Sequence, residues 1–265
     1  MSLMQCNFFS CTLNHYVDVT VYIPSIQNGS AFMNGLKPEE MHLKRQFKTL
    51  YLLHGLLDDH TSWMRFTRVE EYAEKKPLAL VMPSGCNSFY VNGAQKYFEF
   101  INIELPLWAE ANFQLLSGRE NRFIAGLSMG GYGAALGALT LLNHYCAFGS
   151  FSGVVDIVEL SKATDENNID GVEDTLTKAF GSSVAAGSDN DLFFLIKTAL
   201  KSDIEPPKAF VGCGTDDMLY QMNIKFRDYL KETGYPVHYL ECPGGHEWKV
   251  WDYLVEKFIL EWLPI

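Results

Sequence analysis

The sequence predicts an α/β protein with a mostly parallel central sheet and helices on both faces. Short apolar runs alternate with longer helix-like stretches almost to the C-terminus, as expected for repeated strand–helix–strand units. One of these runs, residues 122–125, leads at once into a glycine-rich turn and then into a helix of small residues. The length of 265 residues is enough for one large core, so we expect residues 1–265 to form a single domain.

The expected strands are apolar runs that end at turn residues. Residues 17–23 alternate between apolar and polar side chains, which is typical of a half-exposed edge strand. The other expected strands are residues 47–53, 78–82, 122–125, 146–151, 209–212 and 237–241. Helical character predicts helices over residues 68–76, 103–116, 220–232 and 249–260, and from the glycine-rich turn to residue 142.

Two segments interrupt this alternation. Residues 24–44 are polar, contain glycine and asparagine, and are predicted to form a loop. Residues 154–205 are rich in Asp, Asn, Gly and Ser and contain no obvious strand. We interpret this second segment as a partly helical insertion, which could act as a lid or could be a surface excursion without a role.

The composition narrows the classes of partner. The net charge is −11 and there is no basic stripe, so nucleic-acid binding is not expected. The sequence contains no run of 18 apolar residues, so a membrane span is not predicted, and no signal peptide is evident at the N-terminus. Six cysteines without CxxC spacing are interpreted as reduced thiols. We therefore expect a cytoplasmic protein that binds a small molecule. The sequence does not decide whether the protein forms a homo-oligomer.

A candidate nucleophile lies in the glycine-rich turn. Gly126-Leu127-Ser128-Met129-Gly130 matches G-x-S-x-G, in which a serine projects from a tight turn between a strand and a helix. Glycine two residues to either side removes the Cβ atoms that would collide in this turn. The helix that follows directs its first amide groups at the turn, so the Met129 N–H is a candidate donor to an oxyanion.

A second oxyanion donor is expected after an earlier strand. Leu52-Leu53 runs into His54-Gly55, and glycine permits close approach of the backbone. We choose the Leu56 N–H as the donor, with Leu57 as the alternative. His54 is a possible catalytic base, but we interpret it as a structural histidine that hydrogen-bonds the loop.

The general base is expected among the histidines that follow Ser128, because this motif is followed in chain order by an acid and then by histidine. His144 falls just past the helix and should be on the surface, and His238 lies within a strand-like run. His246 lies in the glycine-rich loop Pro243–Trp248 between the last strand and the last helix. His246 is therefore the candidate base.

The acid is expected after the preceding strand, where two aspartates are adjacent. Residues 209–212 run into Cys213-Gly214-Thr215-Asp216-Asp217. We favour Asp217, because a G-x-x-D pattern that ends just before the next helix is the usual shape of this loop. Asp216 would then be a solvated or helix-capping residue.

Two other chemistries are not supported by the sequence. His246-Glu247 begins like the zinc motif H-E-x-x-H, but Val250 stands where the second histidine is needed. Neither G-x-G-x-x-G nor the P-loop pattern follows a strand. The sequence therefore supports neither a zinc site of this type nor a nucleotide site.

With these residues in place, the chain resembles the esterase D branch of the α/β-hydrolases, and among these the bacterial tributyrin esterases, which are short-chain acetyl esterases. The matching segments are Leu52–Gly55, Ser62-Trp63, Val81–Pro83, Ile124–Gly133, Ser150–Gly153, Cys213–Tyr220 and Gly245–Trp248. They run in the family order from about residue 15 to the C-terminus. The resemblance implies an α/β-hydrolase fold, an acetyl- or butyryl-type acyl pocket, no metal and no cofactor. It also implies the roles of nucleophile, acid and base for Ser128, Asp217 and His246.

The resulting hypothesis is a serine carboxylesterase that cleaves short-acyl esters through an acyl-enzyme. The same branch contains S-formylglutathione hydrolases, feruloyl and acetylxylan esterases, and mycolyltransferases, so thioesterase or acyltransferase activity is an alternative. A hydrolase-fold protein that binds without catalysis is another. The presence of serine, aspartate and histidine together argues against it, since a binding protein does not need all three.

Overall fold

The structure is a computed structural model that describes residues 2–24, 35, 45–167, 172–181 and 184–265. All but two residues of the loop expected at 24–44 therefore lie outside the described residues. No helix in the described ranges is both long enough and apolar enough to cross a membrane.

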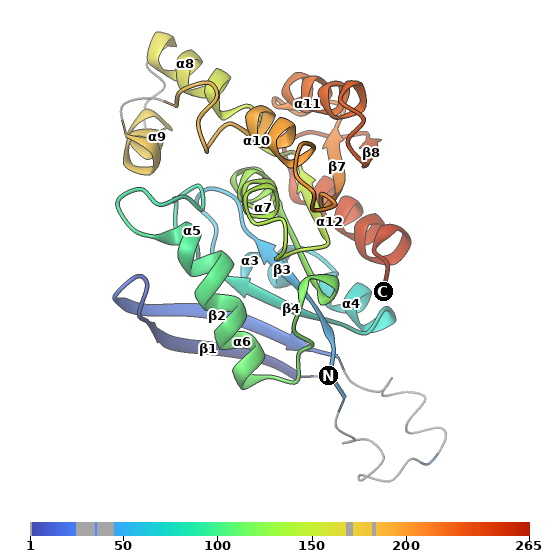
Figure 1. Cartoon of the computed structure of the whole chain (residues 1–265). Coiled ribbons are helices and arrows are strands. Elements are labelled where there is room, and N and C mark those ends of the chain that lie inside the picture. Colours follow the sequence, from blue (N-terminus) through green and yellow to red (C-terminus); the bar gives the residue numbers. More distant parts are fainter. Residues whose placement is uncertain (1, 25–34, 36–44, 168–171, 182–183) are drawn as a thin grey trace.

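An eight-stranded sheet forms the centre of the molecule (Figure 1). Its strands lie in the order β1-β2-β4-β3-β5-β6-β7-β8. Strands β3 to β8 are parallel to one another, whereas β2 pairs antiparallel with both β1 and β4. The strands are β1 Ser2–Ser10, β2 His15–Ile23, β3 Lys48–Leu53, β4 Leu78–Pro83, β5 Arg122–Leu127, β6 Ala147–Phe151, β7 Lys208–Gly214 and β8 Val237–Cys242.

The expected edge strand at residues 17–23 is not at the edge of the sheet. Strand β1 pairs along the whole of β2 and takes the edge position. Its side chains at Met4, Cys6 and Phe8 pack against the core, while the alternate positions face outward. This two-residue alternation at positions 4, 6 and 8 was the signal for a strand at the N-terminus. Because β1 pairs along one side of β2 and β4 pairs along the other, β2 is an interior strand.

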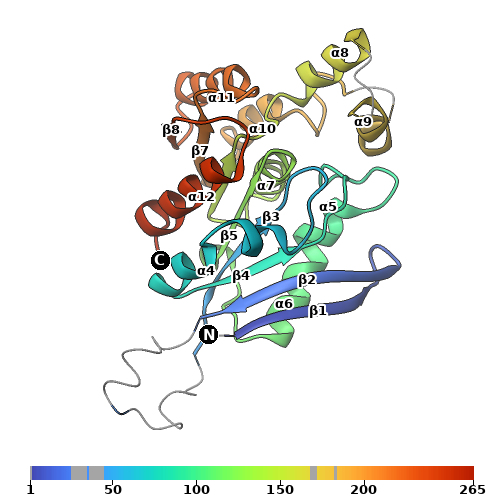
Figure 2. The same ribbon diagram turned by 180° about the vertical axis from the view of Figure 1, so that it is seen from behind.

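Helices cover both faces of the sheet and confirm the predicted α/β architecture. One hydrophobic cluster lies under α6, α7, α10 and α11, and a second lies under α4, α12 and the C-terminal π-helical turn η3 (Figures 1 and 2). The helices are α3 Ser62–Phe66, α4 Val69–Lys75, α5 Tyr97–Glu99, η1 Phe100–Glu104, α6 Leu105–Asn112, η2 Arg119–Asn121, α7 Met129–Thr140, α8 Ile157–Asn167, α9 Val172–Phe180, α10 Leu192–Ala199, α11 Tyr220–Glu232, α12 Trp248–Lys257 and η3 Phe258–Trp262.

The helix expected at residues 103–116 has different ends. Helical structure begins at Tyr97 and continues through η1 into α6, which ends at Asn112. Phe113 is extended, with φ −124° and ψ 164°. The chain then runs beside the start of β3, where Leu115 forms a parallel bridge with Phe47. Pairing with a strand therefore ends the helix earlier than the apolar spacing predicts.

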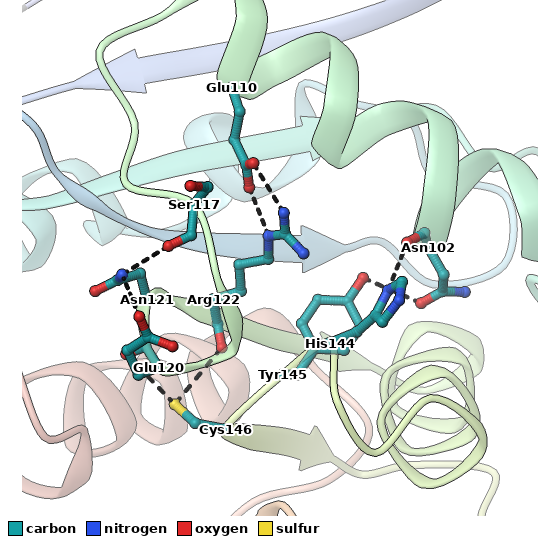
Figure 3. Close-up of polar contacts among 9 residues, drawn as sticks. All are labelled: Asn102, Glu110, Ser117, Glu120, Asn121, Arg122, His144, Tyr145 and Cys146. Carbon is teal, nitrogen blue, oxygen red and sulfur yellow. Dashed lines mark hydrogen bonds and ion pairs between the residues drawn. The ribbon is translucent and has the colours of Figure 1, made fainter.

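Polar contacts join helix α6 to the amino-terminal end of β5 (Figure 3). Both guanidinium nitrogens Nε and Nη2 of Arg122 donate to the Glu110 carboxylate, at 2.5 and 2.8 Å. Both side chains are largely buried, so the pair is shielded from solvent. Nearby, the Tyr145 hydroxyl donates to Asn102 Oδ1 at 3.1 Å. These contacts anchor the end of β5 opposite to the glycine-rich turn.

Residues 154–205 lie between β6 and β7 and contain helices α8, α9 and α10. Helix α10 packs against α7 and α11. The C-terminal end of α9 contacts the loop after β4, where the Ala94 N–H donates to Lys178 O at 3.3 Å. A lid role for this segment stays a prediction.

Candidate active site

The predicted site residues meet at the carboxyl-terminal edge of the parallel strands. Ser128 follows β5, Asp217 follows β7 and His246 follows β8. Parallel strands bring all their carboxyl ends to one edge, where the loops that follow them converge. The topology therefore brings together three side chains that are far apart in the sequence.

The turn that carries Ser128 is as tight as the glycine spacing predicts. Ser128 has φ 52° and ψ −117°, a conformation that side chains rarely adopt. A Cβ atom on Gly126 would lie 2.4 Å from the Gly130 carbonyl carbon, and one on Gly130 would lie 2.5 Å from Leu53 O. Both neighbours are backbone atoms that cannot move aside. Glycine at both positions lets α7 begin directly above β3 and β5.

A continuous chain of hydrogen bonds links the three residues. The Ser128 Oγ and His246 Nε2 atoms are 3.0 Å apart. On the other side of the ring, His246 Nδ1 is 3.1 and 3.0 Å from the two carboxylate oxygens of Asp217. Because a carboxylate only accepts hydrogen bonds, Nδ1 carries the proton and Nε2 is free to accept the Ser128 proton. This is the arrangement of a nucleophile, a base and an orienting acid.

The Asp217 carboxylate stays ionised in this setting. Its side chain is fully buried, and this burial raises its pKa. Hydrogen bonds from His246, from the Leu219 N–H and from the Ser152 hydroxyl lower the pKa by more, so the net pKa is below the ordinary value for aspartate. The carboxylate can therefore stabilise a protonated His246 imidazole.

Asp216 occupies a different position. Its side chain is exposed and accepts the Gly244 N–H at 3.3 Å. The Asp216 N–H donates in turn to Gly244 O at 2.9 Å. Asp216 is thus solvated, as expected, but it joins the loop after β7 to the loop that carries His246 instead of capping helix α11. The two adjacent aspartates point in different directions.

His54 is structural, in agreement with the sequence-based interpretation. It is buried, its Nδ1 donates to Gly55 O at 2.7 Å, and its Nε2 accepts the Gly85 N–H at 2.8 Å. These two partners require the neutral Nδ1–H tautomer. Burial lowers the pKa of His54 to about 4. The ring therefore joins the loop after β3 to the loop after β4.

The two candidate oxyanion donors after β3 are not equivalent. The Leu57 N–H already donates to Asn87 Oδ1 at 2.9 Å. Within the described part of the chain, no residue accepts the Leu56 N–H or the Met129 N–H. A Cβ atom on Gly55 would lie only 3.6 Å from Ser128 Cβ, so the Leu56 amide is close to the nucleophile. This arrangement favours Leu56 over Leu57 as the partner of Met129.

The remaining histidines after Ser128 lie elsewhere. His144 is half-buried beyond the far end of α7, and its Nδ1 is 3.2 Å from Asn102 O (Figure 3). It is less exposed than the sequence predicts because α6 and the preceding π-helical turn pack beside it. His238 is exposed on β8 and stacks on Phe210. In the described part of the chain, neither of them hydrogen-bonds Ser128, whereas His246 does.

Three residues around the site were not identified from the sequence. Asn87 binds the Leu57 N–H. Ser152, which is buried and has φ 47°, donates to Asp217. Trp251 packs edge-on against the His246 ring, with centroids 4.9 Å apart. Asn87 and Ser152 each lie in a loop that follows a strand other than that of their partner, so no local pattern marks these two pairs, whereas Trp251 follows β8 as His246 does.

Two cavities lie beside helix α9. The larger has a volume of about 840 Å³ and is lined by the loop after β4, by Leu136 and Thr140 of α7, and by the end of α9. The smaller, of about 340 Å³, includes Asn87 in its lining. Ser128 and His246 line neither cavity. In the described ranges, no three His, Cys, Asp or Glu side chains are grouped in a way that could hold a metal ion.

The chain is similar to known proteins along most of its length. Residues 32–258 match a family model described as "Putative esterase". An acetyl esterase from Caldicellulosiruptor saccharolyticus is 32% identical over 278 aligned residues, which cover 99% of this chain and 98% of the relative.

Solved structures agree with this match. FphF of Staphylococcus aureus, a fluorophosphonate-binding serine hydrolase, superposes with a TM-score of 0.84 at 32% identity, covering 97% of this chain and 96% of that one. The S-formylglutathione hydrolase FrmB of the same organism superposes with a TM-score of 0.82 at 31% identity, with 97% of each chain covered. The observed architecture is thus the α/β-hydrolase fold.

The two adjacent aspartates allow a matched test. Asp217→Asn should lower kcat for p-nitrophenyl acetate by about three to four orders of magnitude, because an amide at this position favours the wrong His246 tautomer. Asp216→Asn keeps an oxygen acceptor for Gly244 and should change kcat by less than about threefold. Steady-state kinetics of the two variants decide which aspartate is the acid. A larger loss of kcat in Asp216→Asn than in Asp217→Asn would assign the acid to Asp216.

The neutral state of His54 predicts a pH effect. An unfolded histidine titrates near pH 6.5, whereas burial lowers the pKa of His54 to about 4 in the folded protein. Between these values only the unfolded chain binds the proton, so the free energy of unfolding should fall as the pH is lowered from about 6.5 towards 4. NMR of labelled histidine should show His54 still neutral at about pH 5, and a midpoint near 6.5 would contradict the assignment.

Proposed function

This chain belongs to the esterase family, and from that premise we propose that it hydrolyses short-acyl carboxylic esters with Ser128, His246 and Asp217 as catalytic triad. The chain is a carboxylic ester hydrolase of the serine hydrolase class. The observation that supports these three residues best is the unbroken chain of hydrogen bonds from Ser128 Oγ through the His246 ring to the buried Asp217 carboxylate. The cytoplasmic location expected from the sequence stays part of this proposal.

The first half of the reaction forms an acyl-enzyme. His246 Nε2 takes the Ser128 proton as Oγ attacks the ester carbonyl carbon, and the carbonyl π electrons move to the oxygen. Asp217 holds the imidazole in the required tautomer and stabilises the imidazolium. The tetrahedral intermediate collapses, the carbon–oxygen bond to the alcohol breaks, and His246 donates its proton to the leaving alkoxide.

The oxyanion of the intermediate is assigned to two backbone amides. The Met129 N–H begins helix α7, whose dipole favours negative charge at this end. The Leu56 N–H comes from the loop after β3. Neither amide donates to another described residue, so both are available as the charge develops, which is when such donors contribute most.

The second half of the reaction releases the acid. The alcohol leaves, and a water molecule takes its place beside His246 Nε2. His246 removes a proton from this water as its oxygen attacks the acyl carbon, and a second tetrahedral intermediate uses the same two amides. Collapse returns the proton to Ser128 Oγ and frees the carboxylic acid. No metal or cofactor takes part in this scheme.

Two observations support a short acyl group. The relative that matches the full length of this chain is an acetyl esterase. In addition, Tyr132 of α7 lies one helical turn after Ser128, and its ring packs with those of Phe89 and Phe180, with centroids 5.5 to 6.1 Å apart, so bulky rings lie beside this turn. Phe180 of this cluster also lines the larger cavity, whose lining does not include Ser128. Acetyl and butyryl groups are therefore the preferred acyl parts.

A thioester substrate is the second candidate. The S-formylglutathione hydrolase FrmB covers 97% of this chain at 31% identity. Its acyl group, formyl, is even smaller than acetyl, so the same short acyl site would serve. The two candidates differ in the leaving group, which is an alcohol in one and the glutathione thiol in the other.

Replacement of the nucleophile gives the main test. Ser128→Ala should lower kcat/KM for p-nitrophenyl acetate by at least about 10³-fold while the thermal unfolding transition is retained. Ser117→Ala, an exposed serine near the far end of β5, is the matched control and should equal the wild type. Mass spectrometry after fluorophosphonate treatment should place the adduct on Ser128. Retained turnover in Ser128→Ala, or an adduct elsewhere, would reject the nucleophile.

A substrate series distinguishes the two leaving groups. We expect kcat/KM for p-nitrophenyl esters to be highest for acetate and butyrate and to fall towards decanoate. S-formylglutathione should be cleaved less efficiently than the acetate ester under the same conditions. A higher kcat/KM for S-formylglutathione than for the acetate ester would favour a thioesterase over an esterase. A preference for the decanoate ester would reject a short acyl site.

A further inference from the structure

The loop that carries the Leu56 amide is a strained turn. The Asp58 N–H donates to Gly55 O at 3.4 Å, so residues 55–58 form a turn with Leu56 and Leu57 at its centre. Leu57 has φ 66°, a left-handed value that leucine rarely adopts. Turns of this kind normally place glycine there.

Packing of the Leu57 side chain does not explain this conformation. The side chain is 89% exposed, so its burial contributes little to offset the strain. The Leu57 N–H, however, donates to Asn87 Oδ1 at 2.9 Å. This bond is formed only when the peptide between Leu56 and Leu57 faces the loop after β4. It therefore helps to hold the turn in its strained form, together with the bond from the Asp58 N–H to Gly55 O.

The loop that presents Asn87 is itself firmly held. The Gly85 N–H donates to His54, and the Ser88 hydroxyl donates to Gly85 O at 2.6 Å. Beyond Asn87, the buried Tyr90 donates its hydroxyl proton to His54 O at 2.9 Å. Asn87 thus projects from a short segment that is anchored on both sides.

The Leu56 amide lies between two anchored groups. Gly55 O and the Leu56 N–H belong to one trans peptide, so they point in opposite directions. His54 Nδ1 binds the carbonyl side of this peptide at 2.7 Å. Asn87 binds the next peptide through the Leu57 N–H. The direction of the Leu56 N–H is then determined by side chains on both sides of it.

We propose that Asn87 is a positioning residue that directs the Leu56 N–H to the oxyanion of the transition state. This inference rests on the proposed function, because it requires an oxyanion at Ser128. Asn87 does not touch the reacting atoms in this scheme. Its loss would let the turn relax to a negative φ at Leu57 and move the Leu56 amide out of line.

The test compares Asn87→Ala with Gln95→Ala, which removes another exposed amide side chain from the same loop. Asn87→Ala should lower kcat for p-nitrophenyl acetate about 10- to 100-fold, which is less than the ~10²–10³ lost when an oxyanion donor is removed. KM should change by less than about threefold, because the substrate carbonyl carries little charge before the reaction. Thermal melting checks that both variants are folded.

An inhibitor separates positioning from a merely structural role. A trifluoromethyl ketone adds to Ser128 and places an oxyanion between the two amides, so its affinity for Asn87→Ala should fall by the same factor as kcat. Equal kcat and inhibitor affinity in Asn87→Ala and Gln95→Ala would overturn this inference, as would a loss confined to KM. If wild type and Gln95→Ala hydrolyse no ester, the proposed function itself has failed.

Discussion

The close approach of helix α7 to strands β3 and β5 is the constraint on which the site depends. Gly126 and Gly130 meet backbone atoms at distances where no Cβ atom fits. This contact forces Ser128 into φ 52° at the top of the sheet and directs the first amide of α7 at the same point. The positions of the Ser128 side chain and of the first α7 amide therefore follow from the close backbone packing beneath them. They do not depend on the contact with His246.

Backbone strain is concentrated at this edge of the sheet. Of the seven non-glycine residues with positive φ in the described ranges, six follow the parallel strands β3, β4, β5 and β6, and only Asn14 lies in a distant hairpin. The six are Leu57, Cys86, Phe89, Tyr90, Ser128 and Ser152. Such strain persists when the surrounding structure supports it, and it is common at functional sites. The parallel core and its two flanking clusters supply that support.

Asp216 and Asp217 are adjacent in the sequence, but their side chains point in different directions and have different roles. Asp217 turns inward, where it receives hydrogen bonds from His246, Leu219 and Ser152. Asp216 turns outward and holds the loop that carries His246. One aspartate thus orients the imidazole directly, and its neighbour stabilises the loop on which the imidazole depends. His54 and Asn87 share a similar task on the opposite side of Ser128.

The sequence alone determined the alternation of strands and helices and the Ser128 turn, because these depend on local periodicity and on glycine at particular positions. It also led to the proposal of His246 as the base, from its place in a glycine-rich loop after the last strand. It did not reveal strand β1 as the edge of the sheet or the early end of α6, since both follow from pairing with distant segments. Only the tertiary structure decided that the Leu57 amide is occupied, that no described residue accepts the Leu56 N–H, and that Asn87, Ser152 and Trp251 surround the site. The partners of Asn87 and Ser152 lie on other loops, and a hydrogen bond between two loops exists only once the sheet has brought both to the same edge.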